Sequence, residues 1–284
     1  MPDTFAEDLF CPPAHDGHLL LLHTSEAQRG DGVAAWVRQG LNRGEKIIYT
    51  DAHVEQGSGA MLATLRDHGV DGEAATRAGL LERLPLEVFY RPGGWMDAAQ
   101  RALGGGHRRV RVAGDARMAL RRMPRERHLA LEAAATDLCR GAPISILCLY
   151  DPVAASVDHL DAIVTTHLDG VHERQMGTAP HPGGLAFFGE IDLRNEDLFR
   201  RTLRAALGRV TAELVVELSG VTFLGVGGAR ALVTTTQTFR DGGGTLRLEA
   251  PSAPVERLLR MLRVERLPGM ELESASGTTL AGVW

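Results

Sequence analysis

Histidines are the first candidates for metal or acid–base chemistry in this chain of 284 residues, which contains 11 of them. His18 and His23 flank one short apolar run, HLLLLH. On an extended strand, side chains five positions apart point to opposite faces, so these two histidines are not expected to bind one ion. His159 and His167 share a predicted helix but are separated by about 12 Å of helical rise. HExxH and CxxC spacings are also absent. The sequence therefore predicts no metal site and no cofactor.

Carboxylates at the ends of predicted strands form a second group. Asp51, Asp115 and Asp151 each end or follow such a strand. The carboxyl ends of parallel strands are where open α/β sheets bind ligands, although aspartate is also a common helix N-cap. Glu132 lies in an otherwise apolar helical stretch, LALEAAA. Two interpretations stay open for it: a solvated helix face, or a buried carboxylate in a pocket.

A glycine-rich turn, Gly225-Val226-Gly227-Gly228, follows the apolar run VVELSGVTFL. A turn from strand to helix presents unpaired backbone N–H groups, yet this one offers no reactive side chain. It begins like a dinucleotide fingerprint but has Arg230 where glycine or alanine is required. Elsewhere the phosphate-loop pattern GxxxxGK[ST] is absent, and the sequence has no lysine between Pro2 and Lys46 to neutralise phosphates. A nucleotide- or dinucleotide-binding enzyme is therefore the weaker alternative.

Composition narrows the class of protein further. The formal net charge is −5, and no basic stripe with interleaved aromatic residues supports nucleic-acid binding. No apolar run approaches the roughly 18 residues of a membrane span, and the first residues lack the pattern of a secretion signal. We expect a cytoplasmic protein.

Three cysteines, Cys11, Cys139 and Cys148, do not indicate a disulfide framework, and Cys148 is expected to be a buried, inert thiol.

The order of predicted elements indicates two α/β domains. Between residues 10 and 172, nearly continuous apolar strands alternate with helices, which is typical of a parallel sheet covered on both faces. Residues 173–183 lose this periodicity and gather glycine and proline, so they are expected to be a linker. Residues 184–284 form a second, smaller α/β unit, in which Gly189 interrupts a strand and predicts a bulge or a hairpin.

The C-terminal unit resembles the STAS domain of anti-sigma factor antagonists. The likeness runs from about residue 184 to 272 and includes GEIDL, VVELSGVTFLGVGGARAL and LEAPSAPVERLLRMLRVERL. It implies a partner, namely an anti-sigma factor or a related kinase-like signalling protein. The implied partner-binding turn consists of Gly225, Val226, Gly227, Gly228 and Arg230. In the family a serine of this turn is phosphorylated; Gly227 stands at that position, so the resemblance implies a lost phosphoacceptor.

The N-terminal unit resembles the MEDS sensory domain over about residues 15–170. The likeness rests on HLLLLHTSEA, GLNRGEKIIY, GDARMAL, ALEAAA and ILCLYD. It implies a RecA/KaiC-like parallel sheet without a phosphate loop, and a pocket for a small molecule or a partner. The family begins close to His-x-Cys-x-x-Tyr; here His18 is kept, while Leu20 and His23 replace the cysteine and the tyrosine. The candidate pocket residues are His18, His23, Asp115, Glu132, Cys148, Tyr150 and His167.

Taken together, the sequence predicts an α/β signalling regulator rather than an enzyme. A sensory domain would control a STAS domain that binds another signalling protein. A scaffold that docks without switching, in a larger stress-signalling assembly, is the second alternative.

Overall fold

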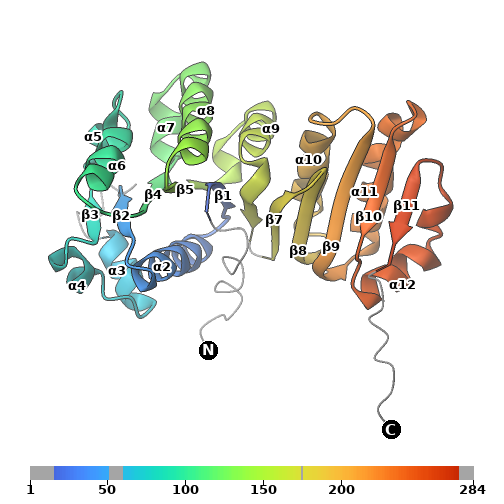
Figure 1. Cartoon of the computed structure of the whole chain (residues 1–284), viewed down its shortest axis with the longest axis horizontal. Helices are drawn as coiled ribbons and strands as arrows, with labels where there is room; N and C mark the ends of the chain where they lie inside the picture. Colours follow the sequence, from blue (N-terminus) through green and yellow to red (C-terminus); the bar gives the residue numbers. More distant parts are fainter. Residues whose placement is uncertain (1–15, 51–59, 174, 275–284) are drawn as a thin grey trace, which may run out of the picture. The chain divides into compact units, whose positions relative to one another are not determined.

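The computed structural model describes residues 16–50, 60–173 and 175–274 (Figure 1). Two positions discussed above, Cys11 and Asp51, lie outside these residues. The chain divides into two compact units, Met1–Arg174 and Gln175–Trp284. They are called unit 1 and unit 2 below, and each is described by itself.

The described strands of unit 1 form a parallel sheet in the order β6-β1-β5-β4-β2-β3. Their bounds are β1 (His18–Leu22), β2 (Lys46–Tyr49), β3 (Leu81–Arg83), β4 (Val110–Asp115), β5 (Ile144–Tyr150) and β6 (Val171–Glu173). Every residue of β1, β2, β4 and β5 is buried. Burial on both faces confirms the parallel, doubly covered sheet that the apolar runs predict.

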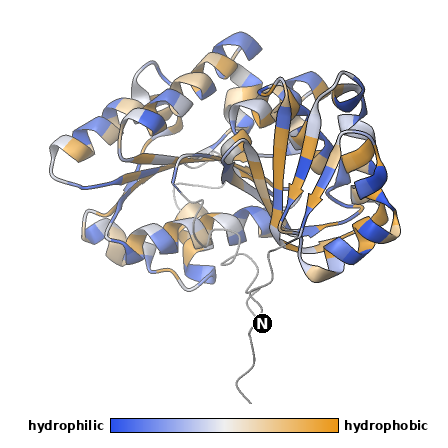
Figure 2. Ribbon diagram, turned by 45° about the vertical axis from the view of Figure 1, so that its right-hand side comes forward, coloured by the Kyte–Doolittle hydropathy of each residue, from blue (hydrophilic) through white to orange (hydrophobic). Residues whose placement is uncertain are grey.

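Helices cover both faces of this sheet. The helices are α2 (Glu26–Asn42), α3 (Ala60–Asp67), α4 (Gly72–Arg77), α5 (Leu86–Phe89), α6 (Gly94–Gly104), α7 (Arg117–Arg122), α8 (Arg125–Gly141) and α9 (Val157–Thr166). In Figure 1, α2 and α3 lie on one side of the strands, and α6 and α8 lie on the other. The ribbon in Figure 2 also shows helices on both sides of this sheet. Ser25 caps α2 by accepting a hydrogen bond from the backbone N–H of Gln28, which satisfies one free donor of the first turn. Short 3-10 turns, η1 (Pro152–Ala154) and η2 (Leu168–Gly170), flank α9.

Unit 2 contains a five-stranded sheet in the order β11-β10-β9-β8-β7. Its strands are β7 (Met176–His181), β8 (Gly184–Ile191), β9 (Glu213–Leu224), β10 (Thr245–Glu249) and β11 (Met270–Glu273). Its helices are α10 (Glu196–Leu207), α11 (Val226–Asp241) and α12 (Ala253–Met261), followed by the 3-10 turn η3 (Val264–Arg266). The strands β8 to β11 are parallel, and β7 runs antiparallel to β8. Gly189 has a positive φ of 84° at a break in the β8–β9 register, which confirms the predicted bulge.

The expected linker is wrong for residues 176–181, which form β7. This strand pairs with β8 along its whole length, from Met176 opposite Gly189 to His181 opposite Gly184. Gly177 and Pro180 lie within β7, whereas Pro182 and Gly183 form the hairpin turn, where Gly183 adopts a φ of 78° that favours glycine. A hairpin and a linker use the same residue types, so composition did not separate them.

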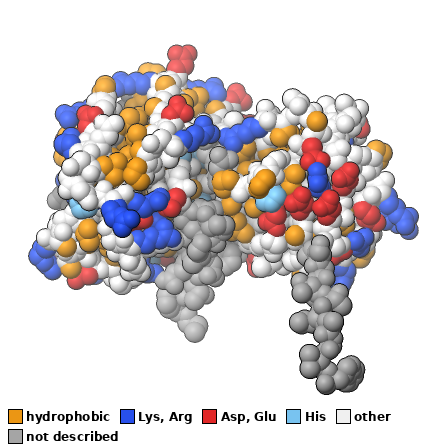
Figure 3. Space-filling view, viewed as in Figure 1, with side chains coloured by type: hydrophobic (Ala, Val, Ile, Leu, Met, Phe, Trp, Pro, Cys, Tyr) orange, Lys and Arg blue, Asp and Glu red, His pale blue; other side chains and the backbone are white. Residues whose placement is uncertain are grey.

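One face of the unit 2 sheet carries charged side chains instead of a core. Along β10, Leu246 and Leu248 are buried, while the alternating Arg247 and Glu249 are partly exposed. Arg247 forms ion pairs with four carboxylates, those of Glu213, Glu249, Glu271 and Glu273. Figure 3 shows this face as a group of acidic side chains around a single basic one. The sheet of unit 2 is thus buried on one side only, unlike the sheet of unit 1.

Among the helices that the structure describes, none combines the length and the apolar character required to cross a membrane.

Candidate functional site

The neighbouring strands β1 and β5 place chemically reactive side chains on one face of the unit 1 sheet. His18 lies opposite Ile146, and Leu20 lies opposite Cys148. Because side chains alternate along a strand, His18, Cys148 and Tyr150 all point to the same face. Helix α8 packs on β1 and β5, and its Glu132 is buried there.

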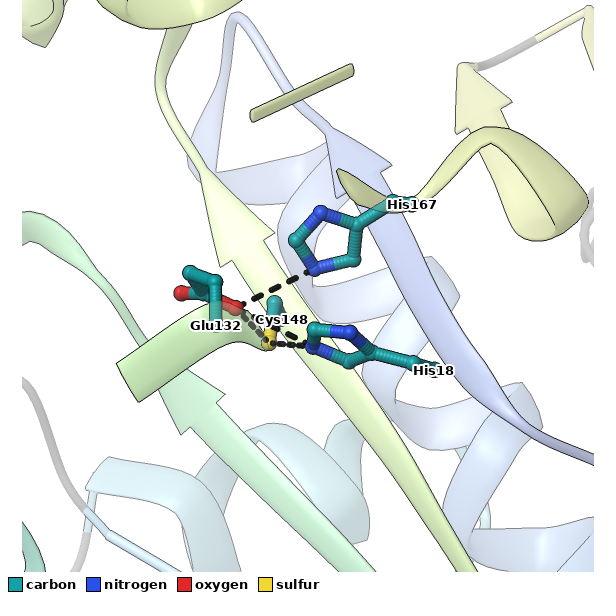
Figure 4. Close-up of side chains that lie close together, drawn as sticks. All are labelled: His18, Glu132, Cys148 and His167. Atoms are coloured by element: carbon teal, nitrogen blue, oxygen red, sulfur yellow. Dashed lines mark hydrogen bonds and ion pairs between the residues drawn. The ribbon is translucent and has the colours of Figure 1, made fainter. Parts of the chain in front are cut away.

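Four side chains meet at this place: His18, Glu132, Cys148 and His167, here called the His–Glu–Cys cluster (Figure 4). The Oε2 atom of Glu132 lies 3.0 Å from Nε2 of His18 and 3.3 Å from Nε2 of His167. The Sγ atom of Cys148 lies 3.3 Å from Nε2 of His18 and 3.5 Å from Oε2 of Glu132. One nitrogen, oxygen or sulfur atom from each residue lies within 4.8 Å of the others, and all four residues are buried.

A second layer of side chains holds the other oxygen of Glu132. The hydroxyl of Tyr150 donates a hydrogen bond to Oε1, and Nε2 of His128 lies 3.2 Å from the same atom. Nδ1 of His128 in turn lies 3.0 Å from Nε2 of His159. Oε1 is therefore fixed by the surrounding fold, while Oε2 faces the cluster.

The ring orientations of both cluster histidines are set from outside. Nδ1 of His167 lies 2.8 Å from the carbonyl of Ile163, which can only accept, so Nδ1 carries the proton. Nδ1 of His18 lies 2.9 Å from Oγ1 of Thr136, whose own hydroxyl donates to the carbonyl of Glu132. In the neutral ring of His167, Nε2 is consequently an unprotonated lone pair that faces Glu132. The hydroxyl of Thr136 can accept a hydrogen bond from Nδ1 of His18 or donate one to it, so either nitrogen of that ring can carry the proton.

Burial and hydrogen bonding act on the ionisation of these groups. Burial alone would raise the pKa of Glu132, but hydrogen bonds from His128, His167 and His18, when the nitrogen facing Glu132 carries a proton, outweigh burial and hold the pKa well below its usual range. Burial, reinforced by His167, lowers the pKa of His18 to about 4. Burial, together with the charge of Glu132, raises the pKa of the Cys148 thiol. At neutral pH the cluster thus holds a carboxylate beside a neutral imidazole and a neutral thiol.

Five of the seven predicted pocket residues lie in or against this cluster: His18, Glu132, Cys148, Tyr150 and His167. The alternative of a solvated helix face for Glu132 is wrong, because that side chain is buried. His23 and Asp115 are not part of the cluster. His23 falls on the opposite side of the β1 alternation from His18, as its spacing predicts, and its buried Nε2 has no hydrogen-bond partner among the described residues.

Asp115 belongs to a separate ion-pair network near the start of α2. Its carboxylate accepts hydrogen bonds from Arg117, which also pairs with Glu26 at 2.7 Å. Arg29, which is buried, pairs with Glu26 at 2.8 Å. The sequence has no lysine near the turn between β1 and α2, which suggested that nothing there could neutralise phosphates. In the structure, Arg29 and Arg117 lie near this turn. Both are paired with carboxylates, so the network is neutralised from within the protein.

In unit 2, the turn between β9 and α11 exposes apolar side chains. Leu193 is 88% exposed, Val226 is 63% exposed and Phe223 is 50% exposed. The carbonyl of Ile191 accepts a hydrogen bond from the N–H of Gly225, which brings the end of β8 beside this turn. Leu193, Phe223, Val226 and the largely exposed Arg230 are here called the turn surface.

Space restricts side chains at two of the three glycines of this turn, Gly227 and Gly228. A Cβ atom on Gly228 would lie 2.7 Å from Leu224 and 2.9 Å from Ile191, both in the core. A Cβ atom on Gly227 would overlap the carboxylate of Glu196, which forms an ion pair with Arg200. Gly225 is the N-cap of α11 and has more room. The predicted turn residues therefore do form the start of one helix, packed against the start of α10.

Sequence reasoning missed three residues that support the cluster: His128, Thr136 and His159. His128, Glu132 and Thr136 follow each other at intervals of four on α8, so they share one helix face. This spacing was the available signal. From the sequence, His159 was considered only as a possible partner of His167 on the same helix. In the structure its partner is His128, on α8.

Comparisons with known proteins identify both units. The family model described as MEDS, "MEthanogen/methylotroph, DcmR Sensory domain", matches residues 17–172. The STAS domain model matches residues 175–277. No curated protein matches the chain.

Several solved structures are similar to parts of the chain. The unphosphorylated anti-sigma factor antagonist SpoIIAA shares 17% identity, with 34% of this chain and 84% of that chain covered, at a TM-score of 0.27. A KaiC-like protein from Pyrococcus horikoshii shares 15% identity over 57% of this chain and 71% of that chain, with a TM-score of 0.40. The flagellar accessory protein FlaH from Methanocaldococcus jannaschii shares 10% identity over 65% of this chain and 81% of that chain, with a TM-score of 0.43.

Since the first family model spans more than half of the 284 residues, the chain belongs to the MEDS sensory-domain family, and its C-terminal unit is a STAS domain.

Proposed function

We propose that this protein is a signalling regulator in which the MEDS unit senses a small molecule or a partner and the STAS unit binds an anti-sigma factor or a related kinase-like protein. The observation that carries the proposal is the turn surface. Val226, at the first position of α11, is exposed within the turn implied by the resemblance to anti-sigma factor antagonists, and Phe223 near the end of β9 and Leu193 after β8 are exposed as well.

The turn surface has the composition of a docking site. Apolar side chains grouped on a surface mark interaction sites more often than single exposed ones do. Arg194 and Arg230 flank the apolar residues and are largely exposed. Arginine and large apolar residues are the types that dominate binding energy at interfaces. A partner with an apolar patch bordered by acidic residues would complement this surface.

Control of binding would come from a source other than phosphorylation of the turn. Gly227 has no hydroxyl, and neither has any residue from Phe223 to Val233. The hydroxyl of Thr222, just before the turn, donates to the carbonyl of Gly189. In our proposal the MEDS unit supplies the signal instead. A ligand of that unit would then have to bind more tightly to one of two states that differ in partner affinity.

Partner binding by variants of the full chain tests this proposal. Val226→Asp places a charge within the turn surface, and we expect it to weaken binding of a cognate anti-sigma factor at least tenfold. Met261→Asp is the matched control, because Met261 is equally apolar, is 70% exposed and lies on α12 of the same unit. Equal effects of the two substitutions, measured by calorimetry, would contradict the turn surface as the binding site.

A phosphorylation assay with the same partner tests the mode of control. We expect no label in the segment 223–233. A partner that binds equally in every state of the MEDS unit would indicate a scaffold that does not switch.

A further inference from the structure

We propose that the His–Glu–Cys cluster is a binding site for one divalent transition-metal ion, and that Zn²⁺ is the ion that its ligands fit best. The proposal concerns unit 1 alone. It does not depend on the binding of any partner by the STAS unit.

The distances within the cluster are close to those of a tetrahedral zinc site. Zinc–ligand bonds of about 2.0–2.3 Å in a tetrahedron place the ligand atoms about 3.3–3.8 Å apart. In the cluster, Oε2 of Glu132 lies 3.0 Å from Nε2 of His18, 3.3 Å from Nε2 of His167 and 3.5 Å from Sγ of Cys148. Nε2 of His18 lies 3.3 Å from Sγ of Cys148. Since all four ligand atoms lie within 4.8 Å of one another, shifts of about 1 Å or less would surround an ion.

The hydrogen bonds of the cluster leave a surplus of acceptors. Nε2 of His18, Nε2 of His167 and Oε2 of Glu132 all face inward; the carbonyl of Ile163 fixes the proton of His167 on Nδ1, and the hydroxyl of Thr136 is placed to accept a proton of His18 on Nδ1. With both ring protons on Nδ1, the thiol proton of Cys148 is the one donor that the described cluster offers to these three acceptors. Nε2 of His167 makes no hydrogen bond with the described residues. A cation at the centre would satisfy all three lone pairs at once.

The type of each ligand selects the class of metal. Imidazole nitrogen and thiolate sulfur favour zinc and related transition metals over Mg²⁺ and Ca²⁺, which prefer oxygen. With Cys148 bound as a thiolate, the two negative charges of the ligands balance one divalent cation. A neutral site is compatible with the burial of all four side chains, whereas an unbalanced charge there would be costly.

The surrounding contacts are those of a metal site with oriented ligands. Metal-bound histidines generally donate their second N–H to a carbonyl, a carboxylate or another acceptor. His167 does so to the carbonyl of Ile163, and the hydroxyl of Thr136 is placed to accept from Nδ1 of His18. Tyr150 and His128 hold Oε1 of Glu132 and leave Oε2 toward the ion. Four protein ligands would fill a tetrahedron, so the geometry points to a structural or sensory ion and not to a catalytic one with an open position.

Metal content of the full chain is the first test. The purified protein is stripped with EDTA, dialysed, incubated with Zn²⁺ and measured by native mass spectrometry and by elemental analysis. We expect one zinc ion per chain. A folded wild-type chain that binds no stoichiometric Zn²⁺ or Co²⁺ would overturn the proposal.

Cobalt substitution identifies the ligands. Tetrahedral Co²⁺ shows strong visible d–d bands, and a bound thiolate adds a charge-transfer band in the near ultraviolet. We expect Cys148→Ser to lose the charge-transfer band and to bind Zn²⁺ at least tenfold more weakly. Cys139→Ser and Cys11→Ser are the controls and should keep both properties. Persistence of the charge-transfer band in Cys148→Ser would place the thiolate ligand elsewhere and overturn the assignment.

Discussion

The carboxylate of Glu196 occupies the space that a side chain at Gly227 would need. Glu196 is the first residue of α10 and is buried, and it pairs with Arg200 and approaches Arg230 to 3.6 Å. The first turns of α10 and α11 thus pack together with only a hydrogen atom of Gly227 between them. Because Gly227 does not have a positive φ, its requirement for glycine is one of volume and not of backbone conformation.

Substitution of Gly227 by serine should therefore destabilise unit 2. The new Cβ forces the Glu196 carboxylate away from its ion-paired position; because this carboxylate ends a flexible side chain that can turn aside, we expect a cost at the low end for overpacking, about 1 kcal/mol. We expect a lower urea midpoint for the unfolding of unit 2 in the full chain. In the double variant with Glu196→Ala, the space is free, so most of the loss due to Gly227→Ser should disappear.

The matched control for this prediction is Gly225→Ser, in the same turn. The nearest atom to a Cβ at Gly225 is 3.5 Å away, and the residue has the extended conformation of an N-cap. Serine is a favoured N-cap residue, so we expect the stability of this variant to stay within about 0.5 kcal/mol of wild type. Equal losses at positions 225 and 227 would show that the Glu196 contact does not determine the effect.

A second prediction concerns a residue that orients a proposed ligand without touching the ion. Thr136→Val keeps the shape of the side chain but removes the acceptor for Nδ1 of His18. We expect the affinity for zinc to fall about 10- to 100-fold, as for other outer partners of metal-bound histidines. Competition with a chromophoric chelator measures this. Thr165→Val removes a similar hydroxyl that bonds within α9, on an exposed surface, and should bind zinc like wild type; an equal loss there would contradict the role of Thr136.

Zinc should also stabilise unit 1 against heat, because the proposed ligands come from β1, α8, β5 and the end of α9. Binding to the folded state alone adds about 2.7 kcal/mol at a free zinc concentration 100 times the dissociation constant. For a unit of this size we expect a rise in melting temperature of about 5–10 °C, which scanning calorimetry measures. Cys148→Ser should show a much smaller rise at the same zinc concentration, and a rise as large as that of wild type would contradict the site.

Acid should weaken unit 1 through Glu26. Partial burial of Glu26 opposes ionisation, but Arg29 and Arg117 outweigh burial and lower its pKa to about 2. A carboxylate with a lowered pKa contributes stability that is fully present above its unfolded pKa and is lost as pH falls toward its folded pKa. The stability difference between wild type and Glu26→Gln should thus be largest near neutral pH and shrink from about pH 4.5 toward pH 2.

Urea unfolding at several pH values checks this prediction. Glu126→Gln, at an exposed position in the first turn of α8, is the control and should show little difference from wild type at any pH. A Glu26→Gln difference that stays constant with pH would mean that its ion pairs do not stabilise the folded state.

Much of the fold was determined by local pattern. Runs such as KIIY and ISILCLY are mostly apolar without alternation, which is typical of strands in a sheet covered on both faces. By contrast, the predicted third strand over residues 81–90 ended at Arg83, because Pro85 begins the short helix α5. The strand β7 lies within the predicted linker, since its antiparallel pairing with β8 is a long-range property that composition does not report.

The sequence by itself determined which residue types are available to the candidate site, and the resemblance to the MEDS family named His18, Glu132, Cys148, Tyr150 and His167. It did not determine that these residues meet. His18 and Cys148 are 130 positions apart, and their contact exists because β1 and β5 are neighbours in one register. His23 is closer to His18 in sequence than any other cluster residue. It is still not part of the cluster, because a side chain five positions along an extended strand points to the opposite face of the sheet. Only the tertiary structure decided the set of ligands, because a polar cluster forms where strands and helices pack, and packing joins residues regardless of their separation along the chain.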